Sequence, residues 1–316
     1  MVANVETMFY VGRTPWHGLG VKLDNPPTVS EAICEAGLDW GVRLEPLYTG
    51  YGDVAPARAT IRETDGQILG VVGPRYVPTQ NAQAFEWFSP FIESGEACFH
   101  TAGSLQQGQK IWVLAQINRP NSEIVRGDEV SKFVMLSNSH DGTTAIRVGF
   151  TPIRIVCANT LAMAHSSKHS KLIRIRHTQS SAINMEKVRD TMNLVDAEFE
   201  ATAEQYRFLA SRMFNQSDIT KYVKTILGVA DVQDSELKTR TRNTMDKIFS
   251  MIENERQTLP GVRGTWWAAY NGVNEYLNYE QGRNNDNRMN SLWFGPGVSD
   301  NYTALKLAVD LANAAA

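Results

Sequence analysis

Apolar and polar residues alternate in several short runs of the first half of the chain, which is the pattern of half-buried β-strands. Val, Ile, Phe and Trp are frequent in these runs and favour extended backbone. Asp65-Gly66 and Asp141-Gly142 each separate two runs and are typical of hairpin turns, so antiparallel pairing is expected. The predicted strands cover residues 39–49, 57–64, 67–73, 109–117, 132–139 and 143–151, with a short strand or extended connector over 171–178.

Apolar residues three and four positions apart predict helices in the rest of the chain. A short helix over residues 30–38 has Thr28 or Ser30 as its N-cap and ends at Gly37. A second helix follows Pro78, and helical spacing dominates from about Ser181 onward. The later helices are predicted over residues 184–214, 218–228, 235–255, 264–280 and 302–314. The expected fold class is α+β, with antiparallel strands and packed helices in the N-terminal half and an α-helical C-terminal half.

This pattern divides the chain into three regions. Residues 1–27 contain TPWHGLG, are rich in Gly and Pro, and are predicted to form an irregular arm that Trp16 holds against the main domain. Residues 28–180 are predicted to form an α+β domain, and residues 181–316 a helical region. The Trp266-Trp267 pair in the helical region is expected to pack in a core or to offer apolar surface for self-association.

Composition places the chain among globular proteins. Of its 316 residues, 42% are hydrophobic and 21% are charged, which argues against extensive disorder. Cys34, Cys98 and Cys157 are far apart and indicate neither a disulfide framework nor a CxxC metal pair, so a reducing cytoplasm is expected. The N-terminus lacks the pattern of a signal peptide, and no apolar run reaches the ~18 residues of a membrane helix.

Charge is unevenly distributed, although the net charge is only −3. The basic segment, residues 142–185, contains no Asp or Glu, which indicates a surface that binds a polyanion. Arg174 and Arg176 alternate and are expected to share one face of a strand, whereas Arg147 and Arg154 share a face only if Thr151-Pro152 interrupts their strand. The alternative is ordinary solvated surface charge. The candidate nucleic-acid-binding residues are Arg147, Arg154, Lys168, Lys171, Arg174 and Arg176.

An enzymatic alternative depends on Cys157 as a nucleophile, with His140 or His17 as its base. Cys157 lies in the apolar run IRIVCANTL, however, where a buried thiol is the ordinary interpretation. His165, His169 and His177 have no nearby carboxylate to complete a metal site. We therefore assign no catalytic residue and expect neither a metal nor a cofactor.

Several phrases, kept in one order through most of the chain, resemble the phage/plasmid-like proteins of the family called domain of unknown function 932. They are TPWHGLG, LGVVGPRYVPTQNAQAFEWF, TAGSLQQGQKIWV, LSNSHDGTTAIRVGFTPIRIVCANTLAMA, WWAAYNGVNEYLNYE and WFG. The resemblance implies an origin in a bacterial phage or plasmid and a place in the host cytoplasm, but no activity. The order helix, Trp-bearing strand, strand, strand, helix after Thr28 is also similar to the core of the single-strand annealing superfamily that includes the Rad-fifty-two proteins.

The leading hypothesis is a non-catalytic DNA-binding protein that acts in single-strand annealing or as a recombination accessory. Its expected partners are single-stranded DNA, further copies of itself and recombination proteins of the phage or host; no membrane is expected. One alternative is a cysteine-dependent hydrolase using Cys157 with His140 or His17. The other is a structural or host-interaction protein of a mobile element.

Overall fold

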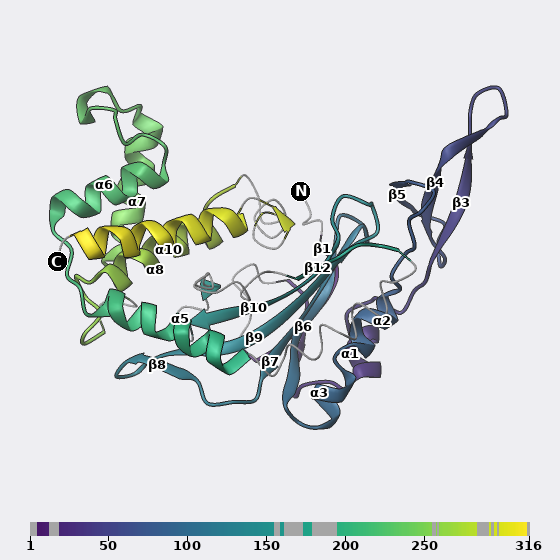
Figure 1. The fold of residues 1–316 in the computed structure, drawn as a ribbon, viewed down its shortest axis with the longest axis horizontal. Coiled ribbons are helices and arrows are strands. Elements are labelled where there is room, and N and C mark those ends of the chain that lie inside the picture. Colours follow the sequence, from purple (N-terminus) through teal and green to yellow (C-terminus); the bar gives the residue numbers. More distant parts are fainter. Residues whose placement is uncertain are drawn as a thin grey trace. The chain divides into compact units, whose positions relative to one another are not determined.

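The computed structural model of the chain (Figure 1) describes most of its residues in two compact units. Unit 1 comprises residues 1–119, 133–150 and 171–195, and unit 2 comprises residues 120–132, 151–170 and 196–316. The predicted boundary between residues 180 and 181 lies outside the described residues. The residues that the structure describes are 5–12, 19–154, 159–160, 173–178, 195–254, 257, 259–282, 291, 294–295 and 297–314.

The larger of two β-sheets follows the strand order β11-β10-β9-β7-β6-β1-β2, with β12 paired to β10 and β8 paired to β9. Its central neighbours β6, β7 and β9 pair antiparallel. Figure 1 shows its strands side by side. Its members are β1 (Val5–Val11), β2 (Val21–Leu23), β6 (Ala97–Leu105), β7 (Lys110–Ile117), β8 (Ser122–Val125), β9 (Asp128–Ser139), β10 (Ile146–Arg154), β11 (Asn159–Thr160) and β12 (Ile173–Ile175).

The N-terminal residues correct one prediction. The prediction of an irregular arm over residues 1–27 is wrong for two segments of it, which form the strands β1 and β2. The strand β1 pairs antiparallel with β6 and places Phe9 opposite Ala102. Phe9 is fully buried. The β-branched and aromatic residues of VETMFYV are the local signal for this strand, but its partner lies about ninety residues away in the chain. Trp16 and His17 lie outside the described residues.

A second sheet in unit 1 contains β3 (Val42–Tyr48), β4 (Val54–Arg62) and β5 (Ile68–Val72) in that order, all antiparallel. The helix α1 (Val29–Glu35) precedes it and begins at a capping box in which Thr28 and Glu31 bond to each other's backbone. After the sheet come α2 (Asn81–Glu86) and α3 (Ser89–Glu93), which divide the single helix predicted beyond Pro78. The three strands predicted around Asp65-Gly66 are therefore confirmed.

The second sheet packs on the turn that joins β9 to β10. Thr60 Oγ1 donates a hydrogen bond to the carbonyl oxygen of His140 at 2.8 Å. Gly70 is required here, because a Cβ atom at this position would lie 2.5 Å from the Cα atom of Asp141. The absence of a side chain thus allows β5 to approach the turn closely.

Replacing Gly70 by Ala is expected to lower the free energy of unfolding by about 1–3 kcal/mol, since the added methyl group meets backbone atoms that have little room to move. Gly73→Ala is the matched control, because nothing lies within 4 Å of the position of its Cβ atom. Urea unfolding of both variants measures the difference. Equal stability of the two would contradict the close approach.

Unit 2 contains the helices predicted for the C-terminal half, packed around the central helix α8. Trp266 and Trp267 are fully buried in this core, so the expectation that they offer apolar surface for self-association is wrong. None of the helices in the described part of the chain has the length and apolar character needed to cross a membrane. The elements are α5 (Val195–Ala210), α6 (Gln216–Ile226), the 3-10 turn η2 (Asp234–Glu236), α7 (Thr239–Ile252), α8 (Trp266–Tyr279) and α10 (Gly297–Ala314).

Candidate nucleic-acid interface

Pairing of β10 with β12 brings together two arginines of the basic segment. Arg147 lies directly opposite Arg174 in the antiparallel register. The flanking pairs, Ile146 with Ile175 and Val148 with Ile173, place apolar side chains on the other face, where Ile146 and Ile175 are buried. Directly opposed residues share one face of a sheet, so Arg147 and Arg174 both point away from this apolar layer.

The electrostatics of this pair are unfavourable within the protein. Burial, and then the charge of Arg174, lower the pKa of Arg147. Like charges directly opposite each other destabilise a pair of strands unless an anion compensates them. Arg174 is exposed, and no ion pair to Arg174 or Arg176 occurs within the described ranges. The exposed guanidinium groups of Arg174 and Arg176 are therefore accessible to an anion from solution.

Two more arginines adjoin this pair. Arg176 is exposed and alternates with Arg174 beyond the end of β12, as the RIR pattern predicted. His177 follows it and stacks on Tyr76, with ring centroids 4.7 Å apart, while Val77 N donates to His177 O at 3.2 Å. These contacts bring the exposed Arg75 beside the basic segment. We call Arg75, Arg147, Arg174 and Arg176 the arginine face.

Arg75 lies outside the basic segment, so the local charge pattern does not single it out. The chain has no Asp or Glu from Gly66 to Phe85, and this second acid-free stretch was the available signal. It is less obvious than the basic segment because Arg75 is its only cation. The contacts of the neighbouring Tyr76 and Val77 with His177, about one hundred positions later, could not be read from local spacing.

Arg154 is the clearest correction among the candidate residues. Its side chain is fully buried in unit 2, where its guanidinium donates to both carboxylate oxygens of Asp128 at 2.5–3.1 Å and to Gln257 Oε1 at 2.6 Å. The strand β10 runs through Thr151 and Pro152 without interruption, so the seven-residue separation leaves Arg147 and Arg154 on opposite faces. The prediction that Arg154 contacts a phosphate is therefore wrong. Lys168 and Lys171 lie outside the described residues.

His140 also has a structural role here, and it does not have the properties of a general base. Its ring is fully buried, Nε2 lies 2.9 Å from Asn81 Oδ1, and the ring packs edge-on against Trp40 with centroids 5.5 Å apart. Burial, and then His177, lower the pKa of His140 to about 3. Such a histidine is neutral at pH 7 but has little tendency to accept a proton.

Other features of the described residues provide no catalytic arrangement. They contain no group of three or more His, Cys, Asp or Glu side chains able to hold a metal ion. A surface depression of about 450 Å³ beside α6 is lined mostly by polar side chains, among which Lys221, Lys224 and Asp234 are charged. Lys224 already bonds to Val232 O and Asp234. Cys157, His17, His165 and His169 lie outside the described residues.

Comparison with known proteins adds one match. The model of a family described as a domain of unknown function, DUF932, matches residues 68–293. No curated protein and no solved structure matches the chain. The matched span includes all four members of the arginine face as well as His140 and the Asp128–Arg154 pair.

Proposed function

The chain belongs to the DUF932 family of domains of unknown function, and we propose that it binds single-stranded DNA. In this proposal it is a phage or plasmid protein that acts in the host cytoplasm in single-strand annealing or as a recombination accessory. The observation that supports it best is the directly opposed pair Arg147 and Arg174, of which Arg174 is exposed and Arg147 half-buried. The exposed guanidinium of Arg174 can donate paired hydrogen bonds to a phosphate of the backbone.

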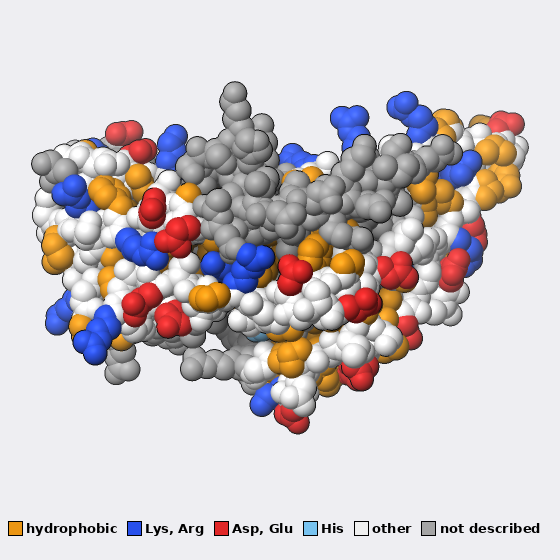
Figure 2. Space-filling model, turned by 60° about the horizontal axis from the view of Figure 1, so that its bottom comes forward, with side chains coloured by type: hydrophobic (Ala, Val, Ile, Leu, Met, Phe, Trp, Pro, Cys, Tyr) orange, Lys and Arg blue, Asp and Glu red, His pale blue; other side chains and the backbone are white. Residues whose placement is uncertain are grey.

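The rest of the surface fits a local site better than a strongly basic coat. On the face drawn in Figure 2, acidic and basic side chains are interspersed over the described residues. The net charge of −3 makes long-range attraction to DNA weak. We therefore expect modest affinity for each copy, and self-association would increase it by repeating the site along one strand. A strictly monomeric mass in light scattering, with and without DNA, would contradict this part of the proposal.

The salt dependence of binding tests the phosphate contacts. If the four members of the arginine face contact phosphates, the logarithm of the association constant should fall with the logarithm of the salt concentration at a slope of about −3. Replacing Arg174 and Arg176 together by Ala should make this slope shallower by about 1.4. Fluorescence anisotropy of a labelled oligonucleotide across salt concentrations measures both slopes.

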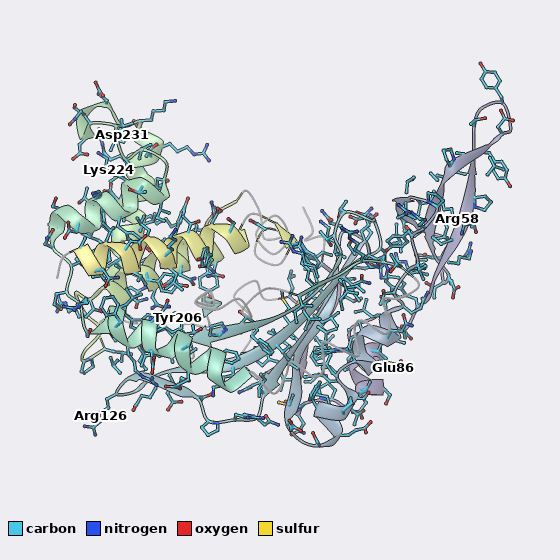
Figure 3. All side chains as sticks on the ribbon, viewed as in Figure 1. Arg58, Glu86, Arg126, Tyr206, Lys224 and Asp231 are labelled. Carbon is cyan, nitrogen blue, oxygen red and sulfur yellow. The ribbon has the colours of Figure 1, made fainter. Side chains whose placement is uncertain are left out.

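A matched double variant controls for the loss of net charge. Arg126, at the turn between β8 and β9 (Figure 3), and Arg240 are exposed arginines of unit 2. Their replacement by Ala removes the same charge and should leave the slope nearly unchanged. If both double variants bind as the parent does, the arginine face is ordinary surface. If the parent does not bind at ~20 mM salt, where counterion release is strong, a structural or host-interaction role becomes the better hypothesis.

A further inference from the structure

The outer part of the second sheet forms an exposed hairpin. Residues 46–56, which we call the finger, comprise the distal ends of β3 and β4 and the loop between them. Figure 1 shows these two strands extending beyond β5. The finger carries three of the large apolar side chains that are most exposed in the described structure, namely Tyr48 at 63%, Tyr51 at 98% and Val54 at 67%.

The loop at the tip of the finger is held in a defined conformation. Thr49 N donates to Asp53 O at 2.8 Å, and Gly52 N donates to Thr49 O at 2.9 Å. Thr49 Oγ1 accepts from the amides of Tyr51 and Asp53 at 3.3 and 3.2 Å. Gly52 has a φ of +88°, which favours glycine. Tyr51 is therefore presented to solvent by an ordered turn.

The sheet face that carries Tyr48 of the finger also carries a positive charge, on Arg58 just beyond the finger. Tyr48 lies opposite Val54, and Pro46 lies opposite Arg58, in the antiparallel register. All four are exposed, while the alternate residues Leu47, Ala55 and Ala57 are partly buried. Arg58 is marked on this hairpin in Figure 3, and it makes no ion pair with any described residue. Figure 2 shows hydrophobic side chains gathered at this end of unit 1.

The composition of the finger restricts what can bind there. Pro46 and Pro56 remove a backbone donor from each strand, which disfavours the addition of a further strand from a second copy. Three apolar side chains are too few to provide the ~800 Å² that each partner buries in a stable protein interface. Tyrosine faces beside an unpaired arginine suit unstacked bases and their phosphates, because stacking accepts any base.

We propose that the finger is a base-stacking site for single-stranded DNA, in which Tyr48 and Tyr51 stack on bases and Arg58 contacts a phosphate. This inference rests on the proposed function and adds the element that contacts bases. The exposed face of the finger continues along the sheet into a packed region. There Thr60 bonds to the carbonyl oxygen of His140, and Val72 lies against Gly142. That turn leads directly into β10, which carries Arg147, so the finger and the arginine face belong to one unit.

The test uses the full chain, an oligonucleotide containing 2-aminopurine, and the variant Tyr51→Ala. Stacking on tyrosine should quench the fluorescence of the bound probe, and Tyr51→Ala should weaken binding about tenfold and reduce the quenching. The slope of affinity against salt should not change, because no phosphate contact is removed. Tyr51→Phe should bind as the parent does, since its ring is retained. Because Tyr51 is almost fully exposed, the variant should keep the parent's circular dichroism.

Val71→Ala is the matched control, because Val71 is an exposed apolar residue of the same sheet but lies outside the finger. Unchanged affinity and quenching in Tyr51→Ala, while Arg174→Ala/Arg176→Ala weakens binding, would overturn the stacking site and leave the proposed function in place. No binding by the parent would overturn both. If Tyr51→Ala instead lowers the mass in light scattering and leaves DNA binding intact, the finger binds a second copy and the stacking site is wrong.

Discussion

Replacing Asp128 by Ala is expected to lower the free energy of unfolding by about 3–5 kcal/mol, because it leaves the charge of Arg154 buried without a counterion. Both side chains are fully buried in unit 2. Asp128 also accepts a hydrogen bond from Trp267 Nε1 at 2.8 Å, and the Arg154 guanidinium lies over the Trp267 ring at 5.3 Å from its centroid. One carboxylate thus joins the start of β9, the end of β10 and the helix α8.

Urea unfolding followed by tryptophan fluorescence measures this loss. Glu96→Ala is the control, because its pair with Arg119 is exposed and its atoms are 3.9 Å apart, so about 0–1 kcal/mol is expected. Replacing Asp128 and Arg154 together by Leu and Met should recover much of the lost stability, since no charge remains in the core. A single Asp128→Ala variant as stable as the control would show that the pair does not stabilise unit 2.

Acid should destabilise the protein from a higher pH than its carboxylates alone would require. The pKa of His140 falls from 6.5 to about 3 on folding, so the unfolded chain binds a proton between these values and the folded chain does not. This contribution to stability is complete above pH 6.5 and is lost as the pH falls, at about 1.4 kcal/mol per pH unit. About 3 kcal/mol should therefore disappear between pH 6.5 and 4.5 from His140 alone.

Burial also lowers the pKa of His100 and of His177, so both act in the same direction. The lowered pKa values of Glu31 and Asp65 mostly affect stability below pH 4.5, and the pKa of Asp300, which burial raises, opposes the effect of the histidines. His140→Gln removes the titrating ring but keeps an amide that can bond to Asn81. It should be less stable than the parent at pH 7 and should lose less stability on acidification. A variant with the parent's full pH dependence would exclude His140 as the source.

The sequence predicted the fold where local signals and tertiary contacts agree. Asp65-Gly66 and Asp141-Gly142 mark hairpins that are present, and the capping box at Thr28 begins the expected helix. The strand β6 was not predicted, because ACFHTAGSL does not alternate cleanly and gains its partners from β1 and β7, on either side of it. Pro90 divides a predicted helix into α2 and α3, since it starts a new turn.

The candidate site could be predicted only in part, for a related reason. Arg174 and Arg176 are both exposed on either side of the buried Ile175, in agreement with the local alternation of the RIR pattern. Arg154 could not be distinguished from them, because its partner Asp128 precedes it by 26 residues and Gln257 follows it by 103. Arg75 depends on the stack between Tyr76 and His177, which joins segments far apart in the chain. The acid-free window predicts a basic surface but does not determine which of its members are exposed.

Each of the two units is built from three separate stretches of the chain, which limits how they can be exchanged by recombination. Two stretches of unit 2, residues 120–132 and 151–170, lie within the sequence that otherwise builds unit 1, and β9 and β10 each cross from one unit to the other. A single genetic crossover or truncation between residues 171 and 195 would separate α8 from both Asp128 and Arg154. Neither unit can therefore be exchanged between relatives as a module by one cut. A recombinant joined there would combine Asp128 and Arg154 of one parent with Trp267 and Gln257 of the other, so these positions have to match across the junction.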